Sequence, residues 1–77
     1  NPTSGMTDIV YNVAEAGYSE IRIIDASGRL VGILDKGDKA IGNYTAHLDA
    51  ANLSEGIYFV QLVSNGSVIT KKVVVAH

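Results

Sequence analysis

Apolar and polar side chains alternate most clearly over residues 57–63. One face of this segment carries Tyr58, Val60 and Leu62. The other, more mixed face carries Ile57, Phe59, Gln61 and Val63. A period of two is typical of a strand that buries one face in a core. Shorter apolar runs before and after this segment offer partners, so we predict that it is the central strand of the domain.

The same alternation predicts five further strands. They cover residues 9–13, 18–25, 29–34, 42–48 and about 67–75. Short connections rich in Gly, Asp and Asn separate them, and no stretch has the spacing of an amphipathic helix. Short strands at regular spacing are typical of antiparallel sandwiches. We therefore predict an all-β, immunoglobulin-like sandwich of six to seven antiparallel strands.

The connections carry their own signals. Residues 35–39 are polar and contain a glycine, which predicts a loop, with a short seventh strand in 36–42 as the alternative. Residues 49–55 form a longer connection into the central strand. Asn65-Gly66 predicts a type I′ hairpin turn, because both residues tolerate positive φ.

A second turn is predicted at Asp25-Ala26-Ser27-Gly28. The Asp25 carboxylate can accept backbone N–H groups two residues on, and Gly28 can adopt positive φ. Arg29 can pair with a nearby carboxylate. The predicted core collects the inward positions of all strands: Ile9, Tyr11, Val13, Ile21, Ile23, Val31, Leu34, Leu48, Tyr58, Val60, Leu62, Val73 and Val75.

Composition narrows the class of protein. A chain of 77 residues makes one domain, and 47% apolar against 18% charged residues predicts a folded chain. Six basic residues and a net charge of −2 argue against a nucleic-acid partner. Without cysteine there is no disulfide or thiolate metal site, and the apolar runs are too short for membrane insertion. No initiator Met or signal peptide is present, so we expect a domain excised from a longer secreted protein.

Catalytic chemistry has little support in the sequence. His47 is expected to point outward from a strand, and His77, the last residue, is expected to be unstructured. The aspartates lie in predicted turns or at strand ends, where water keeps them ionised: Asp25, Asp35, Asp38 and Asp49. A calcium site at Asp35 and Asp38 is a weak alternative, since neither has the spacing of a known loop. We expect no catalytic residue, no cofactor and no metal.

Five short motifs occur in a fixed order along the whole chain: Asn1-Pro2-x-x-Gly5, Asp25-x-x-Gly28-Arg29-Leu30-Val31, Gly42-x-Tyr44, Asn52-Leu53-x-x-Gly56-Ile57-Tyr58 and Lys71-Lys72-Val73-Val74-Val75. In this combination the chain resembles the C-terminal sorting domain of type IX secretion cargo in Bacteroidetes. The immunoglobulin-like domain of the flagellar hook-capping protein is a related structure. The resemblance implies a signal that passes through the periplasm to the cell surface or the medium. It also implies three partners: an outer-membrane translocon, a sortase and an upstream cargo domain.

Each motif also has a purely structural interpretation. The Asn1, Pro2 and Gly5 segment is a common N-terminal turn, and Leu53 and Tyr58 fit core positions, with the Tyr58 hydroxyl bonding a backbone acceptor. Lys71 and Lys72 point to opposite faces of the last strand. They either protect an edge strand from aggregation or mark the strand that the translocon holds, by addition to a sheet edge.

Two other functions stay open at this stage. An accessory module of a secreted hydrolase would present exposed aromatic residues, and only Tyr18 and Phe59 are expected to face outward. A structural spacer would pair weakly with a second copy through a sheet edge.

Overall fold

The computed structural model describes residues 3–77, and Asn1 and Pro2 lie outside the described residues. Its elements, in chain order, are β1 (Met6–Val13), β2 (Gly17–Asp25), β3 (Leu30–Lys39), β4 (Gly42–Asp49), a 3₁₀ turn (Ala50–Asn52), β5 (Gly56–Ser64) and β6 (Ser67–Val75).

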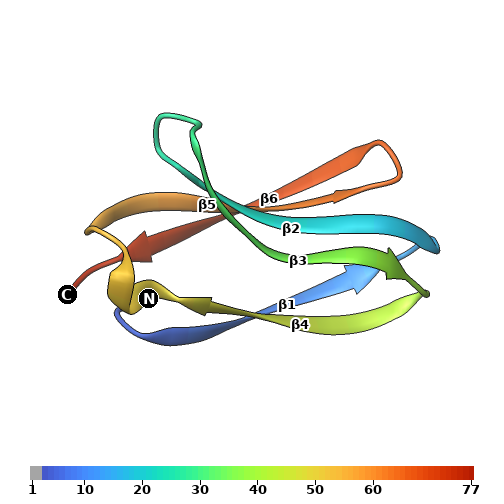
Figure 1. The fold of residues 1–77 in the computed structure, drawn as a ribbon, viewed down its shortest axis with the longest axis horizontal. Helices are drawn as coiled ribbons and strands as arrows, with labels where there is room; N and C mark the ends of the chain where they lie inside the picture. The colour runs from blue at the N-terminus through green and yellow to red at the C-terminus, as the bar shows by residue number, and fades with distance from the viewer. Residues whose placement is uncertain (1–2) are drawn as a thin grey trace.

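The strands form two sheets that pack face to face (Figure 1). The larger sheet has the order β3-β2-β5-β6, and the smaller sheet contains β1 and β4; all neighbouring strands are antiparallel. The predicted all-β sandwich is therefore confirmed. β5 pairs with β2 on one side and β6 on the other, so it is an inner strand, as its alternation predicted.

The core lies between the two sheets. Its buried side chains form two adjoining groups, the first containing Tyr11, Val13, Ile21, Ala46, Val60 and Leu62, and the second Ile23, Leu48, Ala50, Tyr58 and Val75. Ile9, Leu34 and Val73 pack against these groups while half-buried. The prediction missed Ala46, Ala50 and the buried Ser19, whose Oγ lies 3.1 Å from Oγ of Ser64. Small residues carry too little apolar surface to stand out in a hydropathy pattern.

The third strand is longer than predicted. β3 continues through residues 35–39 and pairs with β2 as far as the Lys39–Gly17 pair. The predicted loop in this segment is wrong, and so is the alternative of a seventh strand in 36–42. The segment is polar because it forms the edge of the sheet, where backbone pairing on one side is enough to hold a strand.

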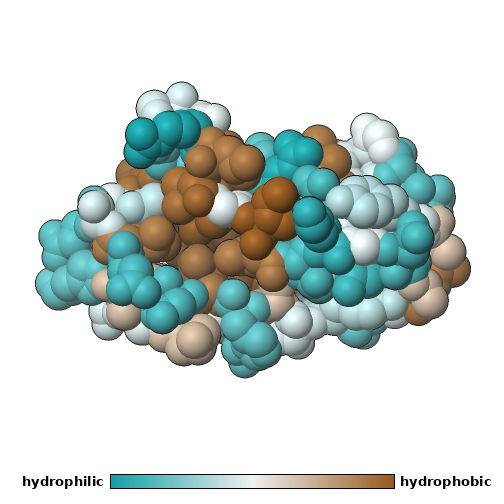
Figure 2. All heavy atoms as spheres, viewed as in Figure 1, coloured by the Kyte–Doolittle hydropathy of each residue, from teal (hydrophilic) through white to brown (hydrophobic). Residues whose placement is uncertain are grey.

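The predicted core position of Val31 is also wrong. The pairing of β2 with β3 shifts between Ile23 and Ile24, which lie opposite Gly32 and Leu30. Val31 is thus the extra residue of a bulge, and a bulge turns its residue out of the regular alternation. Val31 is 40% exposed, and exposed apolar residues form the patch over the first half of β3 in Figure 2.

Candidate recognition surface

The turn between β2 and β3 is built around the Asp25 carboxylate. Oδ1 accepts the backbone N–H groups of Ser27 and Arg29, both at 3.0 Å, and Oδ2 lies 3.2 Å from Nε of Arg29. The Ser27 hydroxyl and the Arg29 N–H hold the pKa of Asp25 below its usual value. Gly28 has a φ of +89°. The turn predicted for this motif is confirmed, and its polar groups form hydrogen bonds with one another.

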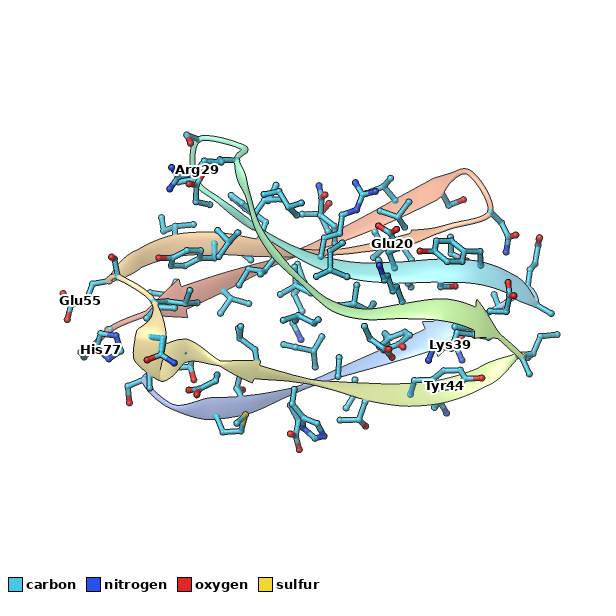
Figure 3. The ribbon with its side chains drawn as sticks, in the orientation of Figure 1. Glu20, Arg29, Lys39, Tyr44, Glu55 and His77 are labelled. Carbon is cyan, nitrogen blue, oxygen red and sulfur yellow. The ribbon has the colours of Figure 1, made fainter. Side chains whose placement is uncertain are left out.

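The connection into β5 carries the next motif. The Tyr58 hydroxyl donates to the carbonyl oxygen of Ser54 at 2.7 Å, which confirms the backbone acceptor expected for this phenol. The prediction that His77 is unstructured is wrong. Its backbone N–H donates to Oε1 of Glu55, and its Nε2 lies 2.8 Å from the carbonyl oxygen of Leu53 (Figure 3).

The N-terminal segment joins the same end of the sandwich. The Thr3 N–H donates to the Val74 carbonyl at 2.8 Å, and the Thr3 carbonyl accepts the Ala76 N–H at 3.0 Å. Thr3 thus forms a parallel bridge with Val75, next to β6. The Gly5 carbonyl then accepts the Ala50 N–H, at the edge of the smaller sheet. The chain therefore crosses from one sheet to the other between residues 3 and 6.

Most of the motif residues meet at this end. Asp25 lies opposite Tyr58, and Gly56 lies opposite Val75. The β2–β3 turn, the start of β5 and both described ends of the chain all lie in the left half of Figure 1, with the turn above the others. Asn1 and Pro2 of the first motif fall outside the described residues. Most of the motifs thus stabilise one end of the fold. Gly42 and Tyr44 lie at the opposite end, where they pair with Val13 and Tyr11, and Lys71 and Lys72 lie in the middle of β6.

Lys71 and Lys72 occupy the middle of β6. Lys71 lies opposite Val60, on the inner face of the sheet, and Lys72 lies opposite Phe59, on the outer face. The prediction that they point to opposite faces is confirmed. Both are exposed, and neither forms an ion pair with any residue in 3–77.

The inner face of β6 is left open next to Lys71. Ile69 lies opposite the buried Leu62, yet it is 65% exposed. The smaller sheet, with its two strands, does not extend over this part of the larger sheet. A groove remains between β6 and β1; its walls include Thr7 and Ile9 from β1 and Lys71 and Val73 from β6. A second hollow, which includes Leu62 and Ile69 in its lining, continues toward the β5–β6 hairpin.

A polar cluster joins β3 to the smaller sheet, and the sequence did not reveal it. The Tyr11 hydroxyl donates to Oδ2 of Asp35 at 3.0 Å, and Nζ of Lys39 lies 3.0 Å from the same oxygen. The Tyr11 ring stacks on Tyr44 with centroids 5.6 Å apart, and Lys39 lies over Tyr44. Lys39 and Tyr11 lower the pKa of Asp35. Burial and the hydrogen bond to Asp35 raise the pKa of Tyr11 to about 12.

The aspartate and histidine side chains considered as catalytic or metal-binding residues do not gather at one site. Asp35 points to Tyr11, whereas Asp38, three residues further along the strand, is exposed; residues an odd number apart point to opposite faces. The two carboxylates therefore do not face a common ion. His47 is outward, as predicted, with Nδ1 2.8 Å from Oδ1 of Asp8. Within residues 3–77 no three His, Asp or Glu side chains are grouped as metal ligands, and no helix is long and apolar enough to cross a membrane.

Comparison with known proteins gives one relationship. Neither the curated proteins nor the solved structures contain a match to this chain. The model of one family, described as the secretion system C-terminal sorting domain, matches residues 1–76. This match covers nearly the whole of the 77-residue chain, so it includes every motif described above. The chain belongs to the family of secretion system C-terminal sorting domains.

Proposed function

We propose that residues 1–77 are a non-catalytic sorting signal that carries an upstream cargo protein through the outer membrane by the type IX secretion system. The observation that carries this proposal is the family match over residues 1–76. The cargo passes through the periplasm, the translocon reads the folded domain, and a sortase removes it while attaching the cargo to the cell surface.

The fold supports a signal that works as a separable unit. Residues 3–77 form a complete two-layer core, and both described ends of the chain lie at one end of the sandwich. A cargo can therefore precede the domain without interrupting a strand of either sheet. In the same residues, no buried side-chain nitrogen or oxygen lacks a hydrogen-bond partner. This is the pattern of a native fold whose buried polar groups are satisfied within the domain itself.

The test is to transplant the domain. Residues 1–77 are fused behind a periplasmic reporter enzyme in a host with a type IX system, and reporter activity is measured outside intact cells. We expect export of the fusion, periplasmic retention of the reporter alone, and retention of the fusion in a strain that lacks the translocon. A fusion with a folded domain that stays in the periplasm of the competent host would overturn the proposal. An accessory binding module or a spacer would give that result.

A further inference from the structure

We propose that the groove between β6 and β1 is an acceptor site for an extended acidic segment of a partner protein, which adds to β6 as a further strand. The inference rests on the proposed sorting function and names the surface through which that function acts.

The free edge of β6 supplies the backbone groups for such pairing. Strand residues bond alternately to one side and the other. The Val74 carbonyl and the Ala76 N–H bond to Thr3, so even-numbered residues of β6 direct their backbone groups away from β5. Val68, Thr70 and Lys72 therefore present their N–H and C=O groups at the open edge.

Thr3 already occupies the first position along this edge. It pairs in parallel with Val75, after which the chain crosses to the smaller sheet. No described strand pairs with β6 along residues 68–72 on this side. A strand added at this edge would meet Thr3 beside Val75, whereas it could pair freely with residues 68–72 of β6.

The smaller sheet leaves room for the added segment. The Gly5 carbonyl accepts the N–H of Ala50, the residue that follows β4, and this places the odd-numbered residues of β1 in hydrogen-bonded pairs with β4. Even-numbered residues such as Asp8 and Val10 therefore direct their backbone groups toward the other edge. The two free edges border the same groove, which is lined by residues of both strands. An added strand would cover Ile69, now 65% exposed over the core.

The charges of β6 identify the kind of occupant. Lys71, Lys72 and Lys36 have no acidic partner within residues 3–77, whereas Arg22, Arg29 and Lys39 each have one. The groove lining also contains Asp8, whose carboxylate lies 2.8 Å from Nδ1 of His47 rather than beside either lysine. An added strand would place one residue opposite each lysine, one on the inner and one on the outer face. Opposite charges in such cross-strand pairs are favourable. We therefore expect two adjacent carboxylates opposite Lys71 and Lys72, and an apolar residue opposite Ile69.

A second copy of the chain is a poorer occupant. Two β6 strands that pair about a two-fold axis at Thr70 would place Lys71 opposite Ile69 of the other copy. Lys72 would then lie opposite Val68 of that copy. Each contact would set an ammonium group against an apolar side chain without a counter-charge, and lysines on edge strands disfavour edge-to-edge pairing in this way.

The test is a titration followed by NMR of the backbone amides. The probes are two blocked peptides that each span only residues 68–72: Thr-Val-Thr-Glu-Glu for parallel addition and Glu-Glu-Thr-Val-Thr for antiparallel addition. Each presents glutamates to Lys71 and Lys72, and valine to Ile69, in its own strand orientation. We expect shifts centred on the amides of Val68, Thr70 and Lys72. A peptide with lysines in place of the glutamates is the matched control, and it should bind at least about fivefold more weakly.

Two variants separate backbone pairing from charge. Thr70→Pro removes an N–H that points away from β5, so the β5–β6 pairing stays intact while binding falls about tenfold. Thr45→Pro is the control, since Thr45 is exposed on the free edge of β4, and its binding should be unchanged. The double variant Lys71→Glu, Lys72→Glu should lose binding by about tenfold and prefer the lysine peptide.

Three results would overturn the proposal: no shift in β6 with either acidic peptide, full binding by folded Thr70→Pro, or concentration-dependent dimers through β6 in the free protein. If folded Thr70→Pro binds the acidic peptide fully and the Lys71→Glu, Lys72→Glu variant does not bind it, the site recognises negative charge without strand pairing. An anionic polysaccharide would then be the better occupant. These readouts are independent of export. Failure of the reporter fusion leaves a positive titration intact, and export without peptide binding rejects only the groove.

Discussion

The Asp35 carboxylate shows how much a single residue contributes to joining the two sheets. It accepts from Tyr11 in the smaller sheet and pairs with Lys39 on its own strand. These partners favour the ionised form, which lowers its pKa from the ordinary 3.8. A carboxyl group with a lowered folded-state pKa stabilises the fold above its unfolded-state pKa. The contribution is lost as the pH falls through the lowered value.

Asp35→Asn should therefore destabilise the protein in a pH-dependent way. At pH 7 we expect a loss of about 1 kcal/mol in the free energy of unfolding, because the partners of a half-exposed carboxylate lose a charged acceptor. Below the lowered pKa of Asp35 the wild-type group is protonated too, so the difference from wild type should close. Urea unfolding at a series of pH values measures this.

Asp38→Asn is the matched control for that series. Asp38 lies on the same strand and is exposed, and it has no salt bridge within residues 3–77. Its substitution should change stability by less than about 0.5 kcal/mol at every pH. A deficit in Asp35→Asn that is as large in acid as at pH 7 would contradict the electrostatic explanation and indicate a packing defect.

At the scale of elements, the β5–β6 hairpin depends on its turn. Asn65 has a φ of +49° and Gly66 of +79°, the signs expected for a type I′ turn. An L residue with a Cβ is disfavoured there, so Gly66→Ala should lower the free energy of unfolding by about 1 kcal/mol. Thermal and urea unfolding measure the change.

Gly32→Ala is the control for the hairpin. Gly32 lies in β3 without positive φ, and an added Cβ would meet only Cγ2 of Ile23 at 3.9 Å, an ordinary contact. We expect a change within about 0.5 kcal/mol. If both variants lose the same free energy of unfolding, the positive φ of Gly66 is not the reason for the destabilisation.

The elements also show what the sequence could predict. Strands with one apolar face and turns with a φ requirement are local signals, so β5, β6 and the Asp25 and Asn65 turns follow from the sequence. The second half of β3 does not, because a pairing shift between Ile21 and Arg22 brings a polar residue, Asp35, to face the other sheet. A hydropathy pattern cannot show that a carboxylate faces inward to meet a phenol and a lysine.

The candidate site was predictable only in part. Lys71 and Lys72 stand out in the sequence, and their opposite directions follow from strand geometry alone. The open edge beside them does not, because it depends on strand order. β6 ends the larger sheet and β1 pairs on one side only, and both facts follow from pairings between distant segments. The exposure of Ile69 on the inner face has the same origin.

At the scale of the whole molecule, the last strand cannot be separated from the fold. β6 contributes Val75, which is 1% exposed, pairs along the whole of β5 and bridges Thr3 near the other end of the chain. At about 0.05–0.15 kcal/mol per residue, a chain of 77 residues is stable by roughly 4–12 kcal/mol. The burial and backbone pairing of the last strand contribute a large fraction of this free energy of unfolding.

Removal of residues 71–77 should therefore unfold the domain, whereas Lys71→Glu with Lys72→Glu should leave it folded. Both lysines are exposed, and their substitution removes no core side chain. We expect no cooperative unfolding transition in the truncated chain by circular dichroism, and a transition within a few degrees of wild type in the double variant. A truncated chain that melts cooperatively would contradict the role assigned to β6. If the expectation holds, export lost on truncation reports unfolding, and only loss in the folded double variant identifies β6 as the surface that the translocon reads.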